Sequence, residues 1–232
     1  MSIDPKKRTY LAVAAVGNVG KTTIAKHVLV PEARADVFTL ETQSGDGEGN
    51  AVSGTELAAH LFSPPATGLV LDIGVGDTVP AIKALQLVAR QDLNLPARLR
   101  IVVPLLPDAK SIAGLRWLLA EIPECLRGSV RTLWNRVRSQ EPIREDLARA
   151  ARVVIKQGGG APLCRPVLHE SALFDPIHPL MRRYASIAAL ASIPDTEIRA
   201  AALSEMPALL AGRDKAQRAV ANCHEVFAAI AY

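Results

Sequence analysis

The sequence predicts a three-layer α/β/α fold, in which helices cover both faces of a mostly parallel β-sheet. Short apolar segments, rich in β-branched residues, alternate along the chain with helical segments. They span residues 10–16, 36–41, 68–74, 99–106, 130–137 and 163–168. Segments this short and this uniformly apolar are typical of strands that are buried on both faces. Strands that alternate with helices favour parallel pairing through helical crossovers.

The helical segments show an apolar spacing of three to four residues. They span residues 21–29, 54–62, 79–91, 111–122 and 143–157. From residue 179 onward the pattern is helical to the end, and we expect breaks at Pro194 and Pro207. The last segment, 216–232, is amphipathic and is expected to pack on the core.

The composition is that of an ordinary globular protein. The chain has 232 residues, 49% of them hydrophobic and 22% charged, and its formal net charge is +4. We expect a single domain over 1–232, with a core at about 9–175 and C-terminal helices at about 176–232. The sequence pI near 9.1 is a mild sign of an anionic partner.

The sequence contains no sign of a membrane protein or a secreted one. No apolar run approaches the ~20 residues of a membrane span, and the N-terminal residues MSIDPKKRTY lack the apolar part of a signal peptide. Three cysteines, Cys125, Cys164 and Cys223, lie far apart without metal-ligand or redox spacing. We therefore expect reduced thiols and a cytoplasmic location.

The strongest motif lies within residues 10–29, YLAVAAVGNVGKTTIAKHVL. A strand, a glycine loop and a helix start follow one another there, which is the context of a phosphate-binding loop, or P-loop. Glycines allow backbone N–H groups to converge on phosphate oxygens, and a helix N-terminus adds its positive end. The residues expected to hold the phosphates of ATP are Gly17, Asn18, Val19, Gly20, Lys21, Thr22 and Thr23.

Two side chains of this loop have expected roles. Lys21 would reach the β- and γ-phosphates, and the hydroxyl group of Thr22 would hold Mg²⁺. The strict P-loop pattern has glycine where Ala15 stands. A glycine-rich turn with a solvated lysine therefore stays open as the alternative.

An acidic residue ends the apolar segment 68–74. Asp72 stands where P-loop proteins place a carboxylate that holds Mg²⁺, usually through water. The alternative is a carboxylate that only caps the strand. Asp77 is the second choice for the metal acid.

Asn135 follows another predicted strand, in the order Asn135-Arg136-Val137-Arg138. Guanine-specific P-loop proteins have Asn-Lys-x-Asp at this place, and Arg138 offers no acceptor to a guanine. Guanine specificity is therefore disfavoured. Asn135 is expected either to contact an adenine edge or to form a turn at the end of the strand.

A polar, glycine-rich segment covers residues 42–50 and follows Glu41. Such a segment cannot bury its backbone and belongs at the surface. It could sense the γ-phosphate, as the corresponding segment of P-loop proteins does, or serve as a plain linker. Basic clusters at 6–8, 131–138 and 182–183 carry no interleaved aromatic residues, so direct contact with DNA is only weakly supported.

Five segments together resemble the ParA/MinD superfamily of P-loop ATPases. They are VGNVGKTTIAKH, VFTLETQSGDGEG, LVLDIGVGD, IVVPLLPDAKSIAGL and TLWNRV, in the family's order over about residues 9–175. The first and third are most similar to the plasmid-stability StbB branch. The resemblance implies an ATPase of plasmid stability, segregation (partition) or conjugative transfer, with ATP and Mg²⁺ as cofactors and a small DNA-binding partner protein from a plasmid operon.

The resemblance also implies site residues, a dimer and a departure. Lys21, Glu41 and Asp72 match the catalytic positions, Thr22 and Asp72 the metal site, and Asn135 the base contact. ParA-type loops carry a lysine that reaches across a nucleotide-sandwich homodimer, and Val16 stands at that position. Because Val16 cannot neutralise phosphates, we expect slow hydrolysis and a weak or rearranged dimer.

Two other functions remain open for this fold. One is a small-molecule kinase or ATP-dependent ligase, which needs a pocket of substrate-fixing polar groups beside the γ-phosphate. The other is a nucleotide-binding scaffold that does not hydrolyse ATP. The sequence offers only the segment 42–50 beside the γ-phosphate, which weakens the kinase or ligase hypothesis.

Overall fold

The structure is a computed structural model that describes residues 4–40, 54–64, 68–136, 142–164, 167–169, 171–175, 177–184 and 186–232. A five-stranded sheet forms its centre, with the strand order β2-β3-β1-β4-β5. The strands are β1 (Thr9–Ala12), β2 (Asp36–Leu40), β3 (Leu69–Ile73), β4 (Leu99–Leu105) and β5 (Val130–Trp134). Every neighbouring pair is parallel, which confirms the predicted sheet.

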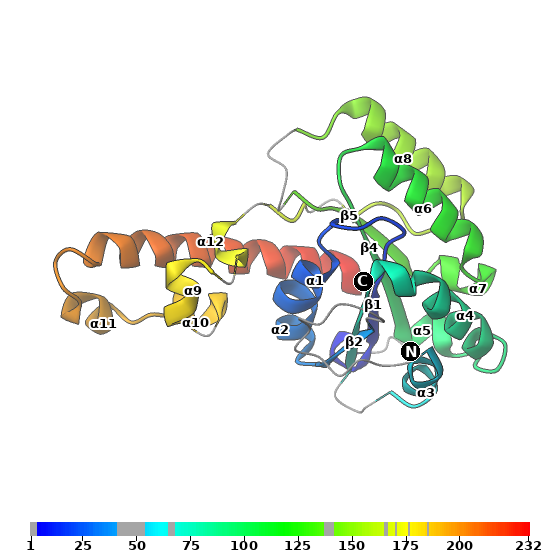
Figure 1. Cartoon of the computed structure of the whole chain (residues 1–232), viewed down its shortest axis with the longest axis horizontal. Helices are drawn as coiled ribbons and strands as arrows, with labels where there is room; N and C mark the ends of the chain where they lie inside the picture. Colours follow the sequence, from blue (N-terminus) through cyan, green and yellow to red (C-terminus); the bar gives the residue numbers. More distant parts are fainter. Residues whose placement is uncertain are drawn as a thin grey trace.

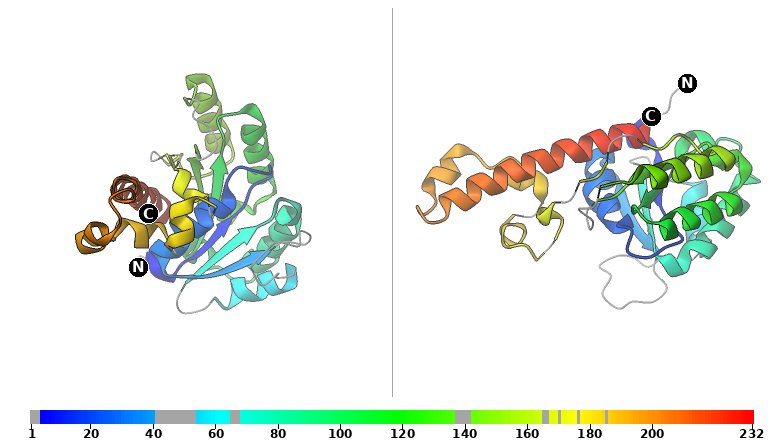
Figure 2. Two further views of the ribbon diagram at one scale, coloured as in Figure 1. Left: turned by 60° about the vertical axis from the view of Figure 1, so that its left-hand side comes forward. Right: turned by 90° about the horizontal axis from the view of Figure 1, so that it is seen from above.

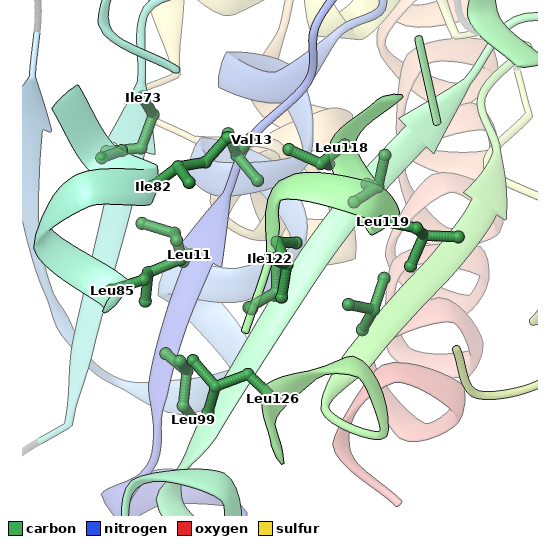
Figure 3. Packing of buried hydrophobic residues seen from close by; sticks show 14 of the residues in the cluster. Leu11, Val13, Ile73, Ile82, Leu85, Leu99, Leu118, Leu119, Ile122 and Leu126 are labelled. Carbon is green, nitrogen blue, oxygen red and sulfur yellow. The ribbon is translucent and has the colours of Figure 1, made fainter. Parts of the chain in front are cut away.

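The sheet has one apolar cluster on each face, because successive side chains of a strand point to opposite sides. On one face, Leu11 and Val13 pack with Ile82, Leu85 and other leucine and isoleucine side chains (Figure 3). The helices of this face are α3 (Gly54–Phe62), α4 (Thr78–Ala89), α6 (Ala109–Glu121) and α8 (Glu145–Gln157).

The other face is covered by the first helix of the chain and by the last one. Tyr10 and Ala12 point to this side, where they pack with Val28 and Phe227, and the rings of Tyr10 and Phe227 lie 5.6 Å apart. Helices on both faces of a parallel sheet make up the predicted three layers, which the structure confirms.

The first helix begins at Lys21, as predicted. It runs through α1 (Lys21–Ile24), a π-helical turn η2 (Ala25–Leu29) and α2 (Val30–Ala33). Pro31 follows the π-helical turn and has no backbone N–H to offer an α-helical hydrogen bond. The helix ends at Arg34, which adopts a left-handed conformation with φ 51°.

The C-terminal region forms an arm, residues 177–216, that extends away from the sheet (Figures 1 and 2). It comprises α9 (Pro179–Arg183), α10 (Ile187–Ala191), α11 (Asp195–Ala200) and the first half of α12 (Met206–Ala231). The second half of α12 returns to the sheet and contacts η2 and β4. The predicted packing of residues 216–232 on the core is therefore confirmed, with Cys223, Val226 and Ile230 buried.

A buried arginine, Arg8, contacts the end of α12. The guanidinium group of Arg8 donates a hydrogen bond to the carbonyl oxygen of Ala231, which places a cation at the negative end of the helix. Burial, followed by the charges of Arg8 and Arg131, lowers the pKa of Arg100 to about 10. Burial also raises the pKa of Tyr10 to about 12, against the opposing effect of Arg8.

The predicted helix breaks at Pro194 and Pro207 are confirmed. Pro194 is the N-cap of α11, and Pro207 lies in the first turn of α12, where proline is tolerated. Two strand predictions differ from the structure. The strand predicted at 10–16 ends at Ala12, because the chain leaves the sheet to form the loop of the site. The strand predicted at 130–137 ends at Trp134, and residue 137 lies outside the described residues.

The strand predicted at 163–168 is wrong for the part of it that the structure describes. Leu168 forms an isolated parallel bridge with Asn135, and the amide of Cys164 donates to the carbonyl of Thr132 at 2.8 Å. No regular ladder joins these two points in the described residues. Pro166 lies between them in the sequence, and a proline cannot donate a ladder hydrogen bond.

Several short elements were not predicted, because each is too short for a periodic pattern. They are η1 (Pro5–Lys7), η3 (Val75–Asp77), α5 (Leu95–Arg98), α7 (Glu124–Arg127) and η4 (Ala172–Phe174). Among the described helices, none combines the length and the apolar character that a membrane span requires.

Candidate functional site

The loop between β1 and α1 depends on two residues with positive φ. Gly20, at φ 82°, directly precedes α1, and Asn18 has φ 61°. Asparagine is one of the few residues other than glycine that adopt this conformation readily. Asn18 can therefore hold the left-handed backbone conformation that this position of the loop adopts.

Gly20 is also required by a close neighbour. A Cβ atom at this position would lie 1.9 Å from the Nδ2 atom of Asn135. Both the backbone conformation and the space thus exclude a side chain, which explains why glycine directly precedes Lys21.

The backbone amides of the loop point to an anion. Within the described part of the chain, no backbone or side-chain acceptor is found for the N–H groups of residues 17–20, 22 and 23. Unpaired donors at the N-terminus of a helix form a receptor for phosphate or another oxyanion. The loop geometry therefore fits the phosphate-binding role that its sequence predicts.

A pocket of about 370 Å³ opens beside this loop. Residues from the loop, the first turn of α1 and the end of β3 line it. They are Gly17, Asn18, Gly20, Lys21, Thr22, Thr23, Asp72, Ile73, Gly74 and Val75. The structure thus brings Lys21, Thr22 and Asp72 to one cavity, as expected, although Val19 and Asn135 are not part of its lining.

Strand pairing determines why Asp72 reaches the loop. β3 lies beside β1, and Asp72 is in register with Ala12, the last residue of β1. The carboxyl ends of parallel strands are where open α/β sheets bind ligands. Asp77 is buried in η3 and does not line the pocket, so the geometry favours Asp72 as the metal acid.

The donor set suits Mg²⁺ bound together with a phosphate. The described residues contain no group of three or more histidine, cysteine or acidic side chains that could hold a metal by themselves. Mg²⁺ usually takes one or two protein oxygens and completes its shell with phosphate and water. Thr22 and Asp72, which line one pocket, fit that arrangement.

Two side chains form hydrogen bonds to backbone carbonyl groups of the segment between β1 and α1. The Nδ2 atom of Asn135 donates to the carbonyl of Val19 at 2.8 Å, and the hydroxyl of Thr78 donates to the carbonyl of Ala14 at 3.0 Å. Thr78 had not been predicted as a site residue, since nothing in its sequence spacing points to the loop. Asn135 is only 1% exposed and supports the loop; its predicted contact with a base stays a prediction.

The side chain of Val16 packs against helix α6 of the same chain. A Cβ atom on Gly114 of α6 would lie 2.8 Å from the Cγ2 atom of Val16, so these two residues are in close contact. The side chain therefore packs between the loop and α6. Glu41, the segment 42–50 and Arg138 lie outside the described residues.

The parallel sheet and its strand–loop–helix unit define an α/β fold of the P-loop NTPase class. The crystal structure of a ParA family ATPase from Chlorobium tepidum TLS is similar to this chain, with 15% sequence identity and a TM-score of 0.44. The similarity covers 98% of this chain and 97% of that one. No protein-family model matches the sequence, and no curated protein matches it.

Proposed function

We propose that this protein binds ATP with Mg²⁺ at the loop of residues 17–23 and acts as a slowly hydrolysing ATP switch. The observation that carries the proposal is the set of loop amides for which the described residues offer no acceptor, at the start of α1 and beside Lys21. An array of this kind stabilises several negative oxygens at once.

Each pocket residue has a distinct role in this proposal. Lys21 would neutralise phosphate charge, and Thr22 and Asp72 would hold Mg²⁺. Bound Mg²⁺ supplies charge neutralisation at the phosphate oxygens. Asn135 and Thr78 fix the positions of the Val19 and Ala14 carbonyls, so that the amides next to them keep their direction. Such preorganisation reduces the cost of binding a multiply charged ligand.

The finer assignments rest on the sequence. Asn135 would in addition approach an adenine edge, and Glu41 would belong to the switch region that responds to the γ-phosphate. The resemblance to ParA and StbB proteins supports a cytoplasmic role in plasmid stability, partition or conjugation. It also supports a small DNA-binding partner protein and a homodimer that Val16 weakens.

Titration calorimetry with MgATP tests the proposal. Lys21→Ala removes a charge from the pocket and should weaken binding by about 1.5–3 kcal/mol, the scale of charge-assisted hydrogen bonds. Lys83→Ala, which removes an exposed lysine from α4, is the control and should bind like the wild type. Equal affinity of Lys21→Ala and the wild type would contradict the assignment.

Turnover measurements separate the switch from the two other functions. Hydrolysis that DNA or a cell extract accelerates supports the switch ATPase. Phosphate transfer to a small molecule would indicate a kinase or ligase instead. Tight MgATP binding without any turnover, with or without these additions, would indicate a non-hydrolysing scaffold.

A further inference from the structure

A second pocket, of about 410 Å³, lies between the middle of α12 and the residues His169, Ser171 and Ala172. Most of the described residues that line it have polar or basic side chains. The lining residues are His169, Ser171, Ala172, Lys215, Arg218, Ala219 and Asn222. None of them lines the P-loop pocket, so the two cavities are separate features of the molecule.

Among the lining residues that the structure describes, two are cations and none is a carboxylate; Glu170 lies outside the described residues. Lys215 and Arg218 are three residues apart on α12 and therefore share a face of the helix. In the part of the chain that the structure describes, neither forms an ion pair. The neighbouring arginines of the arm differ, since Arg183 pairs with Glu205 at 3.2 Å and Arg213 with Asp195 at 2.6 Å.

Hydrogen bonds fix the opposite wall of the pocket to α12. The side-chain oxygen of Asn222 accepts from the amide of His169 at 3.0 Å, and its Nδ2 atom donates to the carbonyl of Val167 at 2.9 Å. These two bonds join α12 to the other wall on both sides of Leu168. A pocket that is held in place before binding loses less conformational entropy when a ligand enters.

The remaining side-chain groups are suited to donating hydrogen bonds. The Ser171 oxygen already accepts from the amide of Leu173 at 3.3 Å, which leaves its hydroxyl hydrogen to donate. Lysine and arginine have donors only, and the arginine fork matches the oxygens of a phosphate. No carboxylate of the described residues pairs with these two positive charges, which disfavours a cationic ligand.

We infer that this pocket binds the phosphate group of a small phosphorylated molecule. Its volume lies within the ~300–1,000 Å³ of small-molecule sites and leaves room beyond the phosphate. The phosphates of a nucleic acid share this chemistry, but α12 also exposes Asp214 and Glu225 close to the pocket in sequence. Those two carboxylates oppose the approach of a long polyanion.

An NMR titration with inorganic phosphate at constant ionic strength tests the inference. The Lys21→Ala protein is the background, so that phosphate binding at the P-loop does not contribute. The side-chain amide of Asn222 is the local reporter. Lys215→Gln and Arg218→Gln should each weaken phosphate binding by about tenfold or more. Arg199→Gln removes an exposed arginine of α11 and should change nothing.

Three outcomes would overturn the inference. They are no shift of the Asn222 amide up to high phosphate concentration, equal weakening by Arg199→Gln, and binding of oligonucleotides but not of phosphate. Because the test does not require that ATP binds, failure of the ATP proposal would leave its result unchanged.

Discussion

The Nδ2 atom of Asn135 lies 2.8 Å from the carbonyl oxygen of Val19 and donates a buried hydrogen bond to it. This bond joins the end of β5 to the loop before α1, and its two residues are 116 positions apart in the sequence. The same Nδ2 atom occupies the space that a side chain on Gly20 would need. The conformation of the loop therefore depends on Asn135 as well as on the loop's own glycines.

Asn135→Ala should lower the free energy of unfolding by about 1–3 kcal/mol. The substitution leaves the buried Val19 carbonyl without its donor, and an unsatisfied buried group costs about that much. Urea unfolding measures the change. Asn94→Ala, at an exposed position, is the control and should stay within about 0.5 kcal/mol of the wild type.

A double-mutant cycle extends this prediction. Gly20→Ala should destabilise the protein both through its positive φ and through the contact with Asn135. Asn135→Ala removes that contact as well as the hydrogen bond to Val19, so the two changes together should cost less than their sum. Strict additivity would show that the two residues do not interact.

Asp72→Asn should leave ATP binding largely intact, while it weakens the Mg²⁺ dependence and slows hydrolysis. A neutral amide is a poorer ligand for a hard cation than a carboxylate is. Calorimetry with and without Mg²⁺, together with turnover, checks both effects. Asp77→Asn is the matched control, because Asp77 is equally buried but does not line the pocket. If only Asp77→Asn shows the effect, the metal acid has been assigned to the wrong residue.

Wild-type protein should form no tight dimer with a non-hydrolysable ATP analogue. A nucleotide-sandwich dimer buries phosphate charges that need cations from the opposite subunit, and Val16 packs instead on Gly114 of its own chain. Sedimentation velocity with and without the analogue measures the state. A tight nucleotide-dependent dimer that is lost in Arg136→Ala would identify an arginine as the substitute for the lysine. The same dimer, unaffected by Arg136→Ala and Arg138→Ala, would refute this explanation.

Stability should fall as the pH drops below the ordinary pKa of histidine, 6.5. Burial, with a smaller effect of Lys26, lowers the pKa of His27, whose ring lies 5.0 Å from that of Phe174. Below pH 6.5 the unfolded chain therefore binds more protons at this residue than the folded chain does, and the free energy of unfolding decreases.

Urea unfolding at pH 7.5 and at pH 5.5, on the wild type and on His27→Gln, checks the effect of His27. The free energy of unfolding should differ less between the two pH values in His27→Gln than in the wild type, because glutamine cannot take up the proton. An identical difference in both proteins would assign the pH dependence to other groups.

The sequence alone was sufficient for the layers, the parallel sheet and the loop. Strands that are buried on both faces are apolar throughout, and helices that cover a sheet have an apolar residue every three to four positions. Both patterns can be read directly from the sequence. The loop is equally local, since glycines, Lys21 and Thr22 adjoin one another in the chain. For the same reason the sequence could point to Asp72, which directly ends an apolar segment.

Only the tertiary structure showed how distant residues meet. Which acid reaches the loop depends on β3 lying beside β1, and the choice of Asp72 over Asp77 depends on that register. The support of the loop by Thr78 and Asn135, the packing of Val16 on Gly114 and the pocket beside α12 all join residues far apart in sequence. Local periodicity records which face of an element is buried, but not which partner buries it, because that choice is made by the packing of the whole chain.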